Sequence, residues 1–272
     1  MSPRPGGGPN RGDLKRVATE IRKKRDLANS LDLAQRRQQV MLPPPPDLAG
    51  YEFASTYDPA ADISGDFYDF VRLGERTVGV LIGDVSGHGI EAAIVMGMAK
   101  KALSIFARLS AGPAEVLVRG NDDLCADLDG ETFLSAVYAV LDADEGRITF
   151  ARAGHPRPTL FRPGAGDPHV ILESRGMVMG MSAGAAFRGA IEEKGVDLRG
   201  GDVAFFYTDG LVEAHNRYGE QYGLDRALAV LEENGGASPA ALLAAIRESV
   251  AEFRSGQEPD DDVTMIAFRR TR

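Results

Sequence analysis

Short apolar runs separated by turn residues dominate the chain beyond residue 50, and this pattern predicts a body rich in strands. The runs typical of strands cover residues 51–57, 67–73, 77–82, 132–141, 147–152, 159–161, 203–208 and 263–268. Apolar residues at helical spacing predict four helices, at about 89–109, 113–128, 224–233 and 239–253. Residues 162–201 are rich in glycine and are expected to be irregular. Strands joined by tight turns favour antiparallel sheets, and the two pairs of helices indicate helical layers outside them.

The first 42 residues differ from this body. Pro and Gly dominate residues 1–12, which we expect to be disordered. Residues 13–42 have apolar and polar residues alternately three and four apart, the pattern of a short coiled-coil seam interrupted by Lys and Gln. This helix either joins two copies into a homodimer through residues 14–42 and relays a signal, or lies on its own domain. The prolines at 43–46 end it, so the predicted body covers residues 43–270.

Charge and cysteine content narrow the class of protein. Residues 1–42 hold ten Lys and Arg against four Asp and Glu, a balance of +6, whereas the rest of the chain holds 21 against 36, a balance of -15. A body this acidic makes nucleic acid an improbable partner, although the basic N-terminal segment is suited to a polyanion or a membrane surface. Cys125 is the only cysteine, so no internal disulfide is possible. Without a signal peptide or an apolar run long enough to span a membrane, we expect a cytoplasmic protein.

Aspartates stand at the ends of several predicted strands. Asp84 ends an apolar run and is followed by a glycine-rich turn into a helix, and Asp209 ends a second run in the same way. Asp261 lies just before the last strand, and Asp66 just before the strand at 67–73. Each aspartate alone has a simpler interpretation, such as capping the helix that follows. Their recurrence at strand ends favours a common site.

A hairpin argument brings two of these aspartates together. The strands at 67–73 and 77–82 are joined by a turn at residues 74–76, so the start of the first lies beside the end of the second. This pairing would place Asp66 and Asp84 at the same end of a sheet. If the other carboxylates meet them there, their repulsion costs several kcal/mol, in order of magnitude, unless cations lie between them. Convergence therefore implies bound metal.

The donor atoms predict which metal and which chemistry. Carboxylate oxygens, with the main-chain carbonyl of Val85 as a further ligand, favour Mg or Mn over Zn or Cu. Two such ions activate a water molecule and neutralise the charge of a phosphoryl group. Hydrolysis of a phosphate ester is the reaction that this set of residues predicts.

Five motifs in order along the chain resemble one family. They are Ser64–Asp69, Asp84–Gly89, Ala153–His155, Tyr207–Leu211 and Asp261–Thr264. Together they are similar to the motifs of the PPM (PP2C-like) serine/threonine phosphatases, and within these to the bacterial branch of the SpoIIE and RsbU type. The segment that ends at Pro44 is also similar to the linker that joins such domains to upstream sensors, which implies an upstream activator.

The resemblance implies a fold, a cofactor and a substrate. The fold is α+β, a four-layer αββα sandwich of two antiparallel sheets flanked by helices, preceded by a linker helix. By matched position, two Mn or Mg ions would be held by Asp66, Asp84, Val85, Asp209 and Asp261, with Asp84 bridging both ions. The implied substrate is phosphoserine or phosphothreonine in a protein, in this branch a STAS-domain antagonist of an anti-sigma factor within a partner-switching pathway that controls a sigma factor in the stress response. The eukaryotic branch has a histidine two residues after the bridging aspartate, where this chain has Ser86, so His88 is the candidate for the general acid.

Two other classes of function remain open. One is a two-metal nucleotidyl cyclase or phosphodiesterase, because residues 64–67 superficially resemble a cyclase signature. This function would leave Asp209 and Asp261 without a role. The other is a module of the same fold that binds a partner without catalysis. His155 follows a predicted strand, where histidine more often makes structural hydrogen bonds than takes part in a reaction.

Overall fold

The computed structural model describes residues 11–271. The chain divides into two units between Met41 and Leu42. The first contains helix α1 (Arg11–Met41), which confirms the predicted helix and extends it two residues toward the N-terminus. Its apolar side chains Ile21, Leu27, Leu33 and Val40 are exposed. The disorder expected for residues 1–12 lies outside the described part of the chain, apart from the first two residues of α1.

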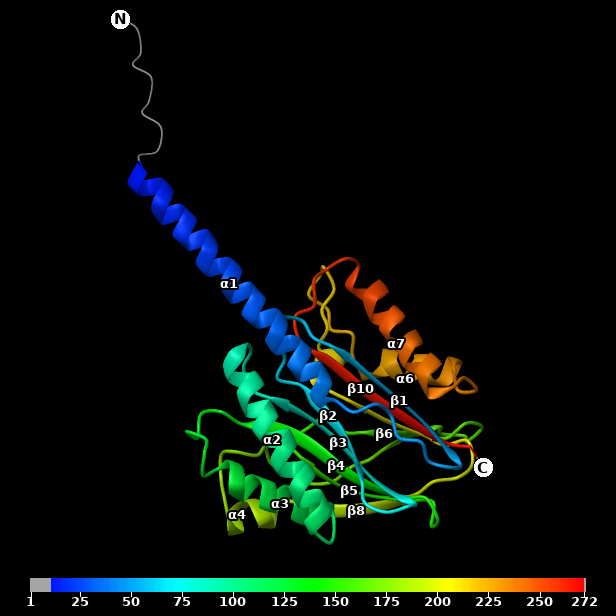
Figure 1. The fold of residues 1–272 in the computed structure, drawn as a ribbon. Coiled ribbons are helices and arrows are strands. Elements are labelled where there is room, and N and C mark those ends of the chain that lie inside the picture. Colours follow the sequence, from blue (N-terminus) through cyan, green and yellow to red (C-terminus); the bar gives the residue numbers. More distant parts are fainter. Residues whose placement is uncertain (1–10, 272) are drawn as a thin grey trace, which may run out of the picture. The chain divides into compact units, whose positions relative to one another are not determined.

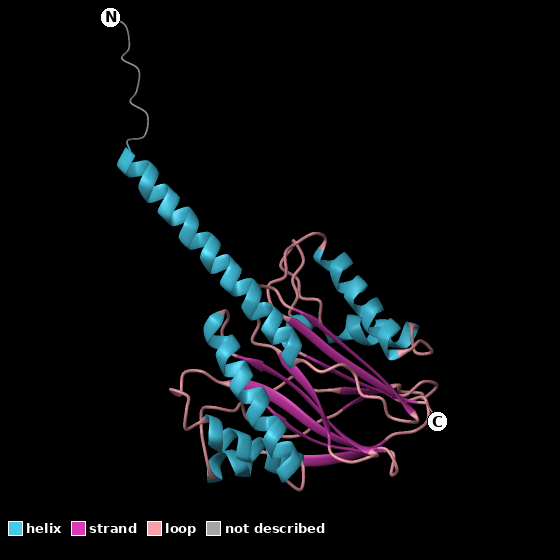
Figure 2. Ribbon diagram, in the orientation of Figure 1, coloured by secondary structure: helices cyan, strands magenta, loops and turns pink. Residues whose placement is uncertain are grey.

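The second unit contains two antiparallel five-stranded sheets, as expected (Figure 2). The first sheet has the order β1-β10-β9-β6-β7 and the second has the order β2-β3-β4-β5-β8. In the first sheet the strands are β1 (Tyr51–Asp58), β10 (Val263–Arg270), β9 (Val203–Tyr207), β6 (Thr159–Phe161) and β7 (His169–Ile171). In the second they are β2 (Phe67–Arg72), β3 (Thr77–Val85), β4 (Leu134–Asp142), β5 (Arg147–Ala153) and β8 (Glu193–Asp197).

Helices cover the outer face of each sheet, which completes the αββα order (Figure 1). The second sheet is covered by α2 (Ile90–Leu109) and α3 (Pro113–Leu124), with the short α4 (Ala185–Ala190) beside α3. The first sheet is covered by α6 (Leu224–Glu233) and α7 (Pro239–Arg254). A single turn, α5 (Asp209–Val212), follows β9. No helix in the described part of the chain combines the length and the apolar character that crossing a bilayer requires.

Three layers of apolar side chains hold the sandwich together. One lies between the second sheet and its helices, one between the two sheets, and one between the first sheet and α6 and α7. The alternation along each strand decides which layer a residue joins, because successive side chains of a strand point to opposite faces. On β3, Val80 and Ile82 face the other sheet, whereas Leu81 and Val85 face the helices. This assignment fixes the direction of the polar residues at the strand ends.

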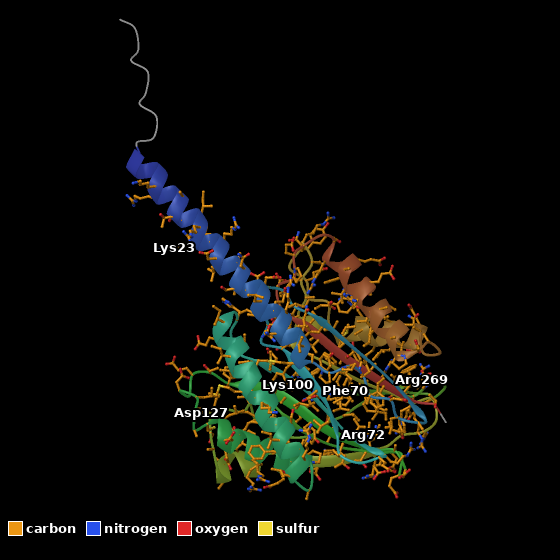
Figure 3. All side chains as sticks on the ribbon, in the orientation of Figure 1. Lys23, Phe70, Arg72, Lys100, Asp127 and Arg269 are labelled. Atoms are coloured by element: carbon orange, nitrogen blue, oxygen red, sulfur yellow. The ribbon has the colours of Figure 1, made fainter. Side chains whose placement is uncertain are left out.

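A buried ion pair joins α2 to the sheet beneath it. The Nζ atom of Lys100 lies 2.7 Å from Oδ2 of Asp69 on β2, and each side chain is about 10% exposed. The Ser104 hydroxyl donates to the same carboxylate oxygen. Figure 3 shows Lys100 on α2, over the sheet that contains Phe70. The pair fixes the position of α2 along β2, because a shift of the helix would leave both charges buried without a partner.

The prediction for residues 162–201 was wrong in part. This stretch contains β7, α4 and β8 as well as irregular segments. The strand β8 pairs with β5 at the edge of the second sheet, and four of its five residues are exposed. Because Val196 is the one residue of the strand that packs against the core, its sequence lacks the apolar alternation that identifies strands.

Candidate active site

The hairpin of β2 and β3 places Asp66 and Asp84 side by side, as the sequence predicts. Phe67 pairs with Gly83 in the register of the two strands, so Asp66 lies directly opposite Asp84. By the alternation of side chains, both point to the face that meets the other sheet, in line with Tyr68 and Ile82 of the inter-sheet core. The two carboxylates therefore lie at the rim of the sandwich, where the apolar layer between the sheets ends.

Residues from the first sheet hold Asp66 in place. Its side chain is buried, with 1% exposed, and its Oδ2 atom accepts a hydrogen bond from Thr208 Oγ1 at 2.8 Å. Thr208 Oγ1 in turn accepts from the backbone N–H of Thr264 at 2.9 Å. Burial, and then the charge of Asp84, hold the pKa of Asp66 well above its ordinary value. The Asp66 side chain is thus held by both sheets, and its surroundings strongly disfavour the charged form.

Asp209 and Asp261 come to the same rim from neighbouring strands. Met265 pairs with Tyr207, so the end of β9 lies beside the start of β10. A Cβ atom at Gly210 would lie 2.1 Å from the carbonyl oxygen of Asp262 and 3.2 Å from Cβ of Asp261. Only glycine therefore allows the turn after Asp209 to approach the segment that carries Asp261.

The carboxylates of these four residues influence one another electrostatically. Burial raises the pKa of Asp84 to about 8, and the negative charges of Asp209, Asp261 and Asp262 contribute to the rise. Burial also raises the pKa of Asp209 and of Asp261, and the charge of Asp209 adds to the effect on Asp261. The side chains whose convergence the sequence predicts therefore share one electrostatic environment.

The carbonyl of Val85 belongs to the same constellation. A Cβ atom at Gly65 would lie 2.8 Å from this carbonyl oxygen and 3.4 Å from Oδ1 of Asp84. The backbone N–H of Val85 donates to the Gly65 carbonyl at 3.3 Å. Because Gly65 has no side chain, the segment that leads into β2 can pass close to the Val85 carbonyl and the Asp84 carboxylate.

Asp262 has a role that the sequence analysis missed. Its two carboxylate oxygens accept hydrogen bonds from the backbone N–H groups of Ala60, at 2.8 Å, and Gly65, at 3.1 Å. It therefore fixes the loop that leads into Asp66. Three consecutive aspartates precede β10. Their sequence gives no sign that Asp262 fixes this loop whereas Asp261 is a candidate metal ligand.

His88 and His155, the two histidines considered for a role from the sequence, differ in their surroundings. His88 is exposed, in the loop between β3 and α2. His155 is buried, with 1% exposed, and its Nδ1 atom lies 2.7 Å from the hydroxyl of Ser135. Burial lowers the pKa of His155 to about 3, so this ring is neutral at physiological pH. A neutral, enclosed histidine hydrogen-bonded to its neighbour fits the structural role expected for it.

The donor set fits hard divalent cations. Carboxylates with raised pKa values and a main-chain carbonyl are oxygen ligands, the type that Mg and Mn prefer. Cations between these carboxylates would remove the repulsion that raises their pKa values. Within residues 11–271, however, no group of three or more His, Cys, Asp and Glu side chains is arranged so that it could hold a metal ion. The carboxylates surround the rim without closing into a ligand shell.

Comparisons with known proteins agree with this geometry. Residues 74–271 match the family described as stage II sporulation protein E (SpoIIE). The chain is 29% identical to protein IcfG of Synechocystis over 93% of its own length, but it spans only 43% of IcfG. It is 27% identical to the phosphoserine phosphatase RsbU of Bacillus subtilis, over 90% of this chain and 71% of RsbU.

A solved structure shares the fold. The SiaA-PP2C domain of Pseudomonas aeruginosa superimposes with a TM-score of 0.78, over 91% of this chain and 98% of that domain, at 22% identity. The fold is therefore that of PP2C-type domains, which confirms the expected αββα sandwich. Because the family match covers most of the chain, this protein belongs to the SpoIIE family.

Proposed function

We propose that this protein is a metal-dependent protein serine/threonine phosphatase. The observation that carries the proposal is the shared electrostatic environment of Asp84, Asp209 and Asp261, three strand-end carboxylates from distant parts of the chain. The name of RsbU, a phosphoserine phosphatase similar over 90% of this chain, supports the same reaction.

The proposed ligand roles are those that the resemblance to the PPM phosphatases implies for the matched positions. Asp84 would bridge two Mn or Mg ions. The main-chain carbonyl of Val85 would be a further ligand of one of these ions. Asp209 and Asp261 would hold one ion, and Asp66 would hold the other directly or through water. When bound, such ions lower the pKa of a coordinated water and neutralise the phosphoryl charge. His88, exposed beside the rim, would donate a proton to the leaving serine oxygen.

The proposed substrate is a phosphorylated STAS-domain antagonist of an anti-sigma factor, in a partner-switching pathway in the cytoplasm. Similarity to the phosphoserine phosphatase RsbU supports a phosphoserine substrate, and the STAS-domain antagonist is what the resemblance to the SpoIIE and RsbU branch implies. In the same proposal α1 joins two copies, and an upstream activator acts through it. Of the exposed apolar side chains of α1, Ile21 lies at a seam position of the predicted coiled coil and would contribute to such a contact.

The decisive experiment measures phosphate release from a phosphoserine peptide with Mn, with Mg and with a chelator. We expect release only with a divalent ion, and none from the Asp209→Asn variant. A nucleotidyl cyclase would instead consume GTP or ATP and leave the peptide intact. A wild-type protein that releases no phosphate with either ion would favour a binding module.

The proton donor and the dimer have separate tests. His88→Asn should lower kcat most for substrates with a poor leaving group, because these need the proton. An equal loss for p-nitrophenyl phosphate would exclude this role. Light scattering should give the mass of a dimer for the full chain and of a monomer for Ile21→Asp. A monomeric wild type would exclude the dimer.

A further inference from the structure

A cationic cavity lies at the end of β5, apart from the acidic rim. It has a volume of about 170 Å³ and is lined by residues from β5, β8 and the segments after β5 and β7. Four of the lining side chains are cationic, and two are acidic. The cationic ones are Arg152, Arg157, Arg175 and Lys194. We call this group the basic pocket.

The acidic side chains only partly neutralise the basic pocket. Glu192 lies 3.8 Å from Nε of Arg175 and 3.6 Å from Nζ of Lys194, so one carboxylate serves two cations. Arg157 is exposed and, among the residues that the structure describes, makes no hydrogen bond or ion pair. The pocket thus carries two positive charges in excess, on a body whose sequence has a net charge of -15.

Arg152 is committed to the walls of the basic pocket. Its Nη2 atom donates to the Ser174 carbonyl at 2.9 Å, and its Nη1 atom donates to the His155 carbonyl at 2.8 Å. Burial, and then the nearby charge of Arg157, lower the pKa of Arg152. The charge of Glu173 raises this pKa, but by less than Arg157 lowers it, so the two guanidinium groups are only partly compensated and an anion would stabilise them.

A buried hydroxyl adds a second sign of a ligand. Ser174 lines the same cavity and is 5% exposed. Its Oγ atom is buried and has no hydrogen-bond partner within the described residues. A buried polar group without a partner costs about 1–3 kcal/mol, which a ligand oxygen would offset. Cations and a hydroxyl donor around one cavity fit a carboxylate or a phosphate.

The sheet register relates the basic pocket to Asp84. Arg152 pairs with Val137, and Asp84 pairs with Ser135, so both lie at the same end of the second sheet, two strands apart. Two strand spacings, with an offset of two residues along the strands, correspond to about 12 Å. Both side chains point to the inter-sheet face, because Ile82, Val137 and Phe150 are part of the core there. An extended peptide crosses this distance in about three to four residues.

We propose that the basic pocket binds an acidic side chain of the phosphoprotein substrate while its phosphoserine lies at the rim. This inference rests on the proposed phosphatase function and adds the substrate class: proteins with Asp or Glu about three to four residues, or about 12 Å in a folded partner, from the phosphoserine. A local cationic site is needed because the acidic body as a whole repels such a substrate.

Paired peptides test the proposal. One carries phosphoserine with two aspartates four residues away, and the other has asparagines in their place. We expect kcat/KM to be higher for the acidic peptide, and the ratio of the two values to fall about tenfold in Arg157→Ala and on addition of salt. Arg217→Ala removes another exposed arginine, outside the pocket, and should leave the ratio unchanged. A wild-type ratio of one, or equal effects of the two variants, would overturn the proposal.

Binding without catalysis separates this proposal from the phosphatase function. Fluorescence anisotropy with the unphosphorylated acidic peptide, in the presence of chelator, reports on the pocket even if the protein releases no phosphate. We expect binding to wild type and to Arg217→Ala, and at least tenfold weaker binding to Arg157→Ala and to the double variant Arg175→Ala/Lys194→Ala. Arg157-dependent binding of inorganic phosphate or of RNA, with none of the peptide, would contradict the proposal.

Discussion

Thr208 and Asp66 are hydrogen-bonded across the gap between the two sheets, with 2.8 Å between Thr208 Oγ1 and Asp66 Oδ2. This bond joins a carboxylate of the second sheet to the strand end that carries Asp209. Thr208→Val should lower the free energy of unfolding by about 1–3 kcal/mol, because a buried carboxylate loses its donor. Urea denaturation followed by circular dichroism measures the change. Thr208→Ser keeps the hydroxyl and serves as the control, and equal loss in both variants would contradict the role of the bond.

Divalent ions should stabilise the protein strongly. At a hundredfold excess over its Kd, a ligand that binds only the folded state adds about 2.7 kcal/mol. For a body of this size we expect a rise in Tm of about 5–10 °C with Mn. Asp84→Asn should abolish the rise, yet be at least as stable as wild type in chelator, because one of the repelling charges is removed. Asp127→Asn, at an exposed position after α3, should behave as wild type. Calorimetry on the three proteins measures the change. An equal rise in Tm with Mn in all three would show that the ion acts unspecifically and would contradict the prediction.

Acid should destabilise the fold through His155. The ring binds a proton with a pKa near 6.5 in the unfolded chain but with a pKa of about 3 in the folded one. The unfolded state therefore gains protons first, and stability falls as the pH drops from about 6.5 toward 3. At pH 5 this group alone costs about 2 kcal/mol.

The variant His155→Gln isolates this effect. Its stability should depend less steeply on pH between 7 and 5 than that of wild type, whatever its absolute value. Chemical denaturation at a series of pH values measures both slopes. Identical slopes would contradict the prediction, because they would show that the ring binds protons equally in the folded and unfolded states.

The ion pair between Lys100 and Asp69 should be costly to break from one side. Asp69→Asn leaves the ammonium group of Lys100 buried without its counter-charge, a loss of about 3–5 kcal/mol. The double variant Asp69→Asn/Lys100→Met should recover much of this loss, since neither position then holds a charge. Denaturation of the single and double variants gives the coupling energy. A double variant no more stable than the single one would show that the pair is not what holds α2 to β2.

The sequence predicts much of this site because its elements are amphipathic and its turns are short. The hairpin at 67–85 has a recognisable pattern of apolar residues and a short turn. Together they fix the register that brings Asp66 beside Asp84. Family membership and the two-sheet fold are likewise confirmed. The ligand roles of the carboxylates stay predictions, which the metal experiments above test.

Other features could not be read from the sequence for physical reasons. The edge strand β8 packs only Val196 against the core and has no apolar pattern. The basic pocket depends on the pairing of β8 with β5, which brings Lys194 close to Arg152. Asp262 is one of three adjacent aspartates, and only its hydrogen bonds to Ala60 and Gly65 distinguish it.

The strand β10 lies between β1 and β9, although it is the last strand of the body to be synthesised. Nearly the whole body must therefore leave the ribosome before β1 can pair with β10. Only then can Asp262 fix the loop that leads to Asp66. A nascent chain that stops short of residue 263 has two open strand edges, which invite aggregation and proteolysis. Assembly of the site is thus tied to the synthesis of β10, so that a chain without this strand lacks the contact that fixes the loop before Asp66.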